Sequence, residues 1–206
     1  MKEQEYRRIE EYMKACMTDA AHDREHVYRV LRAALKIAER EPEADRDILT
    51  AACLLHDIGR EKQYADPKVC HAEAGAEMAR RFLLELGWEE DRVSHVSACI
   101  FTHRFRKGRE PGSMEAKIFF DADKLDVCGA IGIARTLQYQ GRVGEPLYWV
   151  DKEGNPLPGD PGEPDSFLKE YRKKLSKLYG RFYTPAAAEM AKGRRQIAEA
   201  FYQAVW

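Results

Sequence analysis

The sequence predicts an all-α fold, and three observations support this prediction. Apolar residues recur at the i, i+3, i+4 spacing of an amphipathic helix in one segment after another. Strand signals are nearly absent, because no hairpin dipeptide separates two alternating apolar runs before residue 140. Glycine and proline stand where several periodic segments begin or end. We therefore expect one helical domain over residues 1–206, a length that is ample for a buried core.

Four periodic segments define the first expected helices. Their apolar stripes are Val27, Val30, Leu31, Ala34 and Ala38; then Leu49, Ala52, Cys53 and His56; then Met78, Phe82 and Leu86; and then Val96, Ile100 and His103. Gly87 is expected to end the third helix, and the fourth to begin within residues 88–92. Residues 115–137 are expected to form one or two helices, because Gly129 and Gly132 allow close packing or a break.

The composition changes from Gly141 onward. Four prolines fall between residues 156 and 164, together with several glycines, so residues 141–165 are expected to form a loop that can include a short hairpin. This loop either closes over the site or mediates homodimer contacts, and periodicity does not decide between the two. Two closing helices are expected at 166–179 and 185–205, within C-terminal residues 166–206, the second with Pro185 in its first turn.

The bulk composition excludes several classes of protein. With 34 basic and 35 acidic residues, the net charge of -1 favours neither a stable nucleic-acid complex nor a membrane surface. The charged N-terminus lacks the apolar core of a signal peptide, and no run approaches the length of a membrane span. Five scattered cysteines without a C-x-x-C motif are typical of reduced thiols, so we expect a cytoplasmic protein.

Histidines and acids occur on apolar faces of the expected helices. His56, His71 and His103 fall at core-facing positions, and Asp57 directly follows His56 at the end of an apolar helix. A single such histidine is most often a core residue bonded to a backbone carbonyl. Asp123 also lies on an apolar stripe, and a salt bridge would suffice for one buried acid. Two buried acids with several core histidines instead favour a divalent cation.

Three stretches resemble one known family. They are HxxRV at His26, LLHDIG at His56 and Asp57, and AKIFFDADKLDVCGAIGIAR around Asp123. Together they resemble the HD-domain superfamily of metal-dependent phosphohydrolases, and in particular its small single-domain bacterial members. The resemblance covers about residues 20–140 and implies an HD-type helical bundle. It also implies that His26, His56, Asp57 and Asp123 coordinate a metal.

The family pattern bears on two rival assignments. It places the first ligand at His26, which leaves His22 and Asp23 as a helix cap and a solvated turn. Asp121 competes with Asp123, but residues two apart on a helix point in opposite directions. We prefer Asp123, because its face is the apolar one and a basic residue follows it as in the family. His95 has no counterpart in the pattern and is expected to be structural.

The number of metal ions stays open at this point. Family members with two ions carry additional histidines between the His-Asp pair and the last aspartate, and His71 and His103 match that order. Asp57 could then bridge the two ions. Alternatively, His71 and His103 line the pocket, contact phosphate or support the ligands from behind. Mn, Fe, Co, Ni, Mg and Zn all suit a mixed nitrogen and oxygen ligand set.

The resemblance implies hydrolysis of a phosphate ester or anhydride by metal-activated water, with a nucleotide or another small phosphorylated metabolite as substrate. Asp57 or Glu61 is the candidate base, and Lys124 is the third candidate catalytic residue. The candidate substrate-binding cations are Arg29, Arg60, Lys62 and Arg104. Two alternatives remain, namely a nucleotide- or metal-binding regulatory module without turnover and a helical interaction protein without a site.

Overall fold

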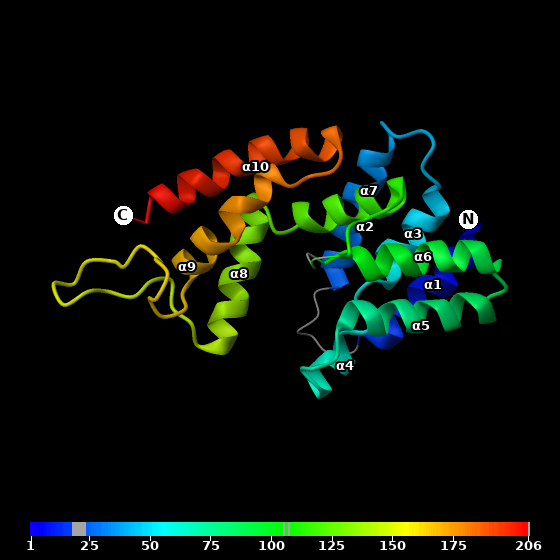
Figure 1. The fold of residues 1–206 in the computed structure, drawn as a ribbon, viewed down its shortest axis with the longest axis horizontal. Coiled ribbons are helices and arrows are strands. Elements are labelled where there is room, and N and C mark those ends of the chain that lie inside the picture. The colour runs from blue at the N-terminus through cyan, green and yellow to red at the C-terminus, as the bar shows by residue number, and fades with distance from the viewer. Residues whose placement is uncertain (18–23, 105, 107, 206) are drawn as a thin grey trace. The chain divides into compact units, whose positions relative to one another are not determined.

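The computed structural model describes residues 1–17, 24–104, 106 and 108–205. Within these residues the regular elements are helices, and the extended backbone is limited to one isolated bridge (Figure 1). The helices are α1 (Glu3–Cys16), α2 (Arg24–Ala38), α3 (Arg46–Leu55), α4 (Arg60–Ala65), α5 (His71–Glu85), α6 (Glu90–Thr102), α7 (Met114–Leu125), α8 (Gly129–Val143), α9 (Phe167–Lys173), the 3-10 helix η1 (Leu175–Gly180) and α10 (Pro185–Gln203). The all-α prediction is confirmed.

Contacts along the chain divide it into two compact units, Met1–Asp123 and Lys124–Trp206. The boundary falls near the end of α7, so the two units share that helix. The expectation of one domain over the whole chain stays a prediction.

Helix α3 lies at the centre of the first unit because most of its sequence is apolar. Ile48, Leu49 and the five residues from Ala51 to Leu55 are buried. The Asp45 carboxylate begins the helix by accepting hydrogen bonds from the backbone N–H groups of Asp47 (2.8 Å) and Ile48 (3.1 Å). Helix α3 packs against α2 and α6, and α6 lies alongside α5 (Figure 1). A helix with so little polar surface requires this cover on several sides.

Glycine ends or interrupts helices at two of the expected positions. Helix α5 ends at Glu85, and Leu86 caps it. Gly87 follows with a φ of 90° that other residues rarely adopt. Helix α6 begins at Glu90, inside the expected range. A short break separates α7 from α8, and Gly129 begins α8 with a φ of 65°. Residues 115–137 thus form parts of two helices, one of the two alternatives that the glycines allowed.

The second unit differs from the prediction in its details. Helix α8 continues to Val143, so the loop begins later than residue 141. The helix expected over 166–179 is interrupted at Lys174, whose φ of -131° is not helical, and a 3-10 helix follows. The last helix ends at Gln203 rather than at residue 205. Aromatic residues pack the core of this unit, as where Tyr171 stacks on Tyr202 with ring centroids 4.5 Å apart.

The loop contains the short hairpin that the sequence allowed. Val150 and Pro156 form an antiparallel bridge, and the Leu157 N–H donates to the Trp149 carbonyl at 2.6 Å. Gly154 provides the positive φ of 87° in the turn. None of the helices described is long and apolar enough to cross a membrane. The five cysteines, all in the described part, are free of disulfides. A cytoplasmic location stays a prediction, as does a homodimer.

Candidate metal centre

The chain turns sharply after α3, and His56 and Asp57 lie in that turn. His56 still has helical dihedral angles as the residue that follows α3, and Gly59 precedes α4. Gly59 lies directly on the first turns of α5, because a Cβ added there would be 2.4 Å from the His71 carbonyl oxygen and 2.5 Å from the Gly75 nitrogen. The absence of a side chain therefore lets the His-Asp turn approach His71 at backbone distance.

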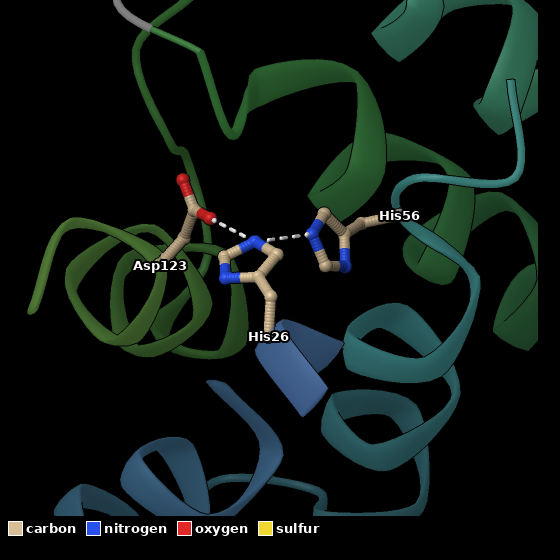
Figure 2. A group of neighbouring side chains, drawn as sticks. All are labelled: His26, His56 and Asp123. Carbon is tan, nitrogen blue, oxygen red and sulfur yellow. Dashed lines mark hydrogen bonds and ion pairs between the residues drawn. The ribbon is translucent and has the colours of Figure 1, made fainter. Parts of the chain in front are cut away.

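A first group of side chains comprises His26 from α2, His56 after α3 and Asp123 from α7. Figure 2 shows the three side chains pointing toward one another. The Nε2 atom of His26 lies 3.3 Å from Nε2 of His56 and 3.2 Å from Oδ1 of Asp123. His56 is fully buried, and its Nδ1 lies 2.8 Å from the Cys53 carbonyl. Since a carbonyl only accepts, Nδ1 carries the proton and Nε2 presents a lone pair to His26.

A second group comprises Asp57, His71 from α5 and His103 after α6. The Nε2 atoms of His71 and His103 lie 3.3 Å apart. Both rings hold their proton on the opposite nitrogen, since Nδ1 of His71 donates to Gln63 Oε1 at 2.7 Å and Nδ1 of His103 donates to the Ile100 carbonyl at 2.5 Å. Two lone pairs therefore face each other in a buried place without a proton between them.

The Asp57 carboxylate reaches both groups. Its Oδ1 lies 3.6 Å from Nε2 of His71, and its Oδ2 lies 3.5 Å from Nε2 of His56. Arg60 Nε donates to Oδ2 at 3.0 Å. Within the described residues, Oδ1 is a buried oxygen without a hydrogen-bond partner. An unpartnered buried carboxylate oxygen is costly, so its site requires a further positive or donating group.

The electrostatics favour ionised acid and neutral imidazole. Burial raises the pKa of the Asp57 carboxyl, but the Arg60 guanidinium and the imidazoles of His56 and His26 lower that pKa well below its usual range. Burial, assisted by the charge of Arg60, lowers the pKa of His71 to about 2. Near neutral pH the site therefore holds an ionised Asp57 and an unprotonated His71, the forms in which these side chains bind metal.

These residues fit a divalent cation. In each group the candidate ligand atoms all lie within 4.8 Å of one another. The two facing imidazole lone pairs repel each other, and Oδ1 of Asp57 is buried without a hydrogen-bond donor in the described part of the chain. A cation coordinated by these three atoms would remove both unfavourable interactions. Mixed nitrogen and oxygen donors suit first-row divalent ions.

The aromatic ring of Phe119 packs against one histidine of each group. Phe119 is fully buried and lies one turn before Asp123 on α7. Its ring centroid lies 5.3 Å from that of His56 and 5.7 Å from that of His103. The phenyl ring thereby limits the positions that two of the histidines can take, one from each group.

The candidate cations occupy different places. Arg60 contacts Asp57 directly. Arg104 lies near the start of α5, with Nη1 3.8 Å from the Cys70 sulfur, next to His71. Arg29 is half-buried on α2, one turn after His26, while Lys62 is exposed on α4 beside the equally exposed Glu61. Lys124 is half-buried on α7 and belongs to the second unit.

The two rival aspartates differ in burial, in the opposite sense to our expectation. Asp121 is fully buried, whereas the Asp123 side chain is 13% exposed. Burial alone would therefore have selected Asp121, whereas the contact of Asp123 with His26 favours Asp123 as the ligand. His22 and Asp23 lie outside the described residues. His95 bonds Ser113 Oγ at 2.8 Å and Glu115 Oε2 at 3.0 Å, away from both groups.

Gln63 and the role of Phe119 were not predicted from the sequence. Gln63 belongs to a six-residue helix too short for periodicity to reveal a face. Phe119 was recognised only as part of an apolar stripe, because its sequence position does not show that it packs on histidines.

The fold and the site together define a class of protein. The family model of the HD domain matches residues 24–128, a range that includes His26, the His-Asp pair, His71, His103 and Asp123. The chain belongs to the HD-domain family.

Relatives match over nearly the whole chain. YpgQ of Bacillus subtilis is 31% identical over 193 residues, which cover 92% of this chain and 86% of YpgQ. A crystal structure of an HD-superfamily hydrolase from Bacillus thuringiensis is 32% identical and superposes with a TM-score of 0.74, covering 100% of this chain and 96% of the other. YpgQ has also been crystallised in complex with ADP, and that structure is 26% identical with a TM-score of 0.74, covering 98% and 93% of the two chains.

Proposed function

We propose that this protein is a metal-dependent phosphohydrolase that cleaves a phosphate ester or anhydride of a nucleotide or another small phosphorylated metabolite. The observation that carries the proposal is the meeting of two imidazole lone pairs, 3.3 Å apart, beside the orphan Oδ1 of Asp57. Membership of the HD-domain family and the similarity to an HD-superfamily hydrolase support a hydrolytic reaction.

We infer that each group holds one divalent ion. His26, His56 and Asp123 form the ligand set of the first, and His71 and His103 with Asp57 form that of the second. The position of Asp57, with one oxygen toward each group, suits a carboxylate shared by both ions. Bound divalent ions would polarise a phosphoryl oxygen and lower the pKa of a nearby water.

Arginines supply the positive charge that a phosphate requires. Asp57 engages the Nε of Arg60, and a guanidinium has further N–H donors that can bind phosphate oxygens. Arg104, next to the first turn of α5, is the second candidate. Arg29, Lys62 and Lys124 remain proposed contributors.

The electrostatics of Asp57 favour one of the two candidate bases. A carboxylate whose pKa lies well below its usual range holds a proton poorly, so Asp57 is better suited to binding a cation than to accepting a proton. Glu61, exposed on α4 near the His-Asp turn, is therefore our preferred candidate base.

A nucleotide is the favoured class of substrate. The support is the complex of the relative YpgQ with ADP, which carries both a phosphate anhydride and a phosphate ester. On this basis we propose a nucleotide as the substrate of the present chain.

The proposal is tested by incubating the purified protein with nucleoside mono-, di- and triphosphates and with Mn²⁺, Co²⁺, Mg²⁺ or Zn²⁺ in turn. Product analysis distinguishes release of monophosphate from release of pyrophosphate. We expect turnover with at least one metal, and its loss in the His56→Ala and Asp57→Ala variants, while the His95→Gln variant serves as the matched histidine control. Metal and nucleotide binding without turnover under every condition would instead indicate a regulatory module.

A further inference from the structure

The histidines of the site differ in what holds their second ring nitrogen. Nδ1 of His56 and Nδ1 of His103 each donate to the backbone carbonyl three residues earlier, Cys53 and Ile100 respectively. Nδ1 of His71 instead donates to a side chain, the amide oxygen of Gln63, at 2.7 Å. Backbone carbonyls thus fix the orientation of the His56 and His103 rings. The orientation of the His71 ring depends on the side chain of Gln63, which a substitution can remove.

Gln63 reaches His71 from a different helix. It lies on α4, which packs against α5, and its N–H donates to the Gly59 carbonyl at 3.4 Å. The side chain is half-buried, and α4 has no fully buried residue. Gln63 therefore contributes little to the hydrophobic core, and its side chain is placed to hydrogen-bond to His71.

We propose that Gln63 is a positioning residue that fixes the tautomer and orientation of His71 and thereby sets the affinity of the Asp57, His71 and His103 group for its divalent cation. This inference rests on the metal site of the proposed function. With the proton held on Nδ1 by Gln63, the lone pair of Nε2 points toward Asp57 and His103. Without Gln63 the ring can place its proton on Nε2, which would block that ligand position.

The effect is confined to one of the two groups. The side chain of Gln63 hydrogen-bonds to His71, which belongs to the second group, and the Cys53 carbonyl fixes His56 separately. Loss of the residue that hydrogen-bonds to the other ring nitrogen of a metal-bound histidine typically weakens metal binding by about 10–100-fold. We therefore expect that loss for the second ion and an unchanged affinity for the first.

Two substitutions separate positioning from a general structural role. Gln63→Leu removes the acceptor and keeps a side chain of similar helix propensity. Gln63→Glu keeps an acceptor at the same reach and adds the charge of a carboxylate, so it should restore or tighten binding of the second ion. Gln138→Leu makes the same chemical change at an exposed position on α8 and serves as the control.

The first measurement needs no metal. In chelator-treated protein, with retention of helix checked by circular dichroism, ¹⁵N chemical shifts of the imidazoles report the tautomer of each ring. We expect His71 in the Nδ1–H form in the starting protein and in the Gln63→Glu variant, and a shift toward the Nε2–H form in Gln63→Leu. His56 and His103 serve as internal references that keep the Nδ1–H form throughout.

The second measurement is calorimetric titration of the same proteins with Mn²⁺. We expect two binding events. In Gln63→Leu, the affinity of the Asp57, His71 and His103 group should fall by about 10–100-fold, and the affinity of the other group should not change. Unchanged His71 shifts in Gln63→Leu, or equal weakening of both events, would overturn the role of Gln63. If the starting protein binds no metal, the proposed function fails, and the ¹⁵N shifts still decide whether Gln63 positions His71.

Discussion

The Nε2 atoms of His71 and His103 lie 3.3 Å apart, although neither carries a proton. In both rings the proton is on Nδ1, which donates a hydrogen bond to another residue. Helices α5 and α6 pack side by side, and this packing brings the two lone pairs together. Among the residues that the structure describes, the nearby Oδ1 of Asp57 adds a third acceptor without a hydrogen-bond donor. The arrangement is unfavourable without a cation and favourable with one, and the first prediction follows from it.

Divalent cations should stabilise the folded protein. A ligand that binds only the folded state at 100 times its dissociation constant adds about 2.7 kcal/mol to the free energy of unfolding. We expect the melting temperature, followed by circular dichroism, to rise on addition of Mn²⁺ and to fall back on addition of EDTA. The double variant His56→Ala/Asp57→Ala should lose this response, and a response of unchanged size in that variant would contradict the assignment of these ligands.

Gly59→Ala should disturb the link between the His-Asp turn and α5. The φ of Gly59 is -85°, which any residue can adopt, so the backbone conformation does not require glycine. The added Cβ would however lie 2.4 Å from a backbone oxygen and 2.5 Å from a backbone nitrogen. We expect a loss of roughly 1–3 kcal/mol in the free energy of unfolding, measured by urea denaturation, together with weaker Mn²⁺ binding.

Gly193→Ala is the matched control for that substitution. Gly193 lies inside α10, and a Cβ added there would meet no atom within 4 Å. The same change should therefore stabilise the protein by up to about 1 kcal/mol, because alanine favours a helix over glycine. If both variants lost stability equally, close packing of Gly59 would not be the cause.

The N-terminal cap of α3 should make stability depend on pH. Burial raises the pKa of Asp45, but hydrogen bonds from the Ile48 and Asp47 N–H groups and from Arg92 lower it overall. A carboxyl whose pKa is lower in the folded state contributes stability that is fully present above its unfolded pKa of about 3.9 and lost as the pH falls through the folded value. Melting temperatures between pH 2 and 6 measure this loss.

Two variants separate the cap from the charge of Asp45. Asp45→Asn keeps a side chain that caps helices well but cannot titrate, so its melting temperature should fall less steeply below pH 4. Asp45→Ala loses the cap at every pH, at a cost of about 1 kcal/mol. A pH profile of Asp45→Asn that parallels the original protein would show that other carboxyl groups dominate the acid transition.

The helices and the groups of ligands follow from different kinds of information in the sequence. The i, i+3, i+4 stripes predicted the helices of the first unit, because each stripe must be buried against a neighbour. They did not predict the break at Lys174, since a short 3-10 turn keeps the spacing of buried residues almost unchanged. The hairpin around Gly154 was visible only as one possibility, because turn residues indicate a reversal without fixing its register.

The candidate site was predicted in its residues but not in its organisation. The order of histidines and aspartates along the chain indicated which side chains meet, as the resemblance to the HD-domain family implied. The division into two groups with Asp57 between them depends on the close contact of Gly59 with α5, which no periodic pattern contains. Gln63 was missed for a similar reason, because its partner is eight residues away on another helix.

Anomalous diffraction tests most directly whether these groups bind metal. Crystals grown with Mn²⁺ are measured above and below the manganese absorption edge, and the difference maps are inspected at both groups. We expect one anomalous peak among His26, His56 and Asp123 and another among Asp57, His71 and His103, present above the edge and absent below it. Well-ordered ligand side chains without an anomalous peak at either group would contradict the central claim that this is a metal centre.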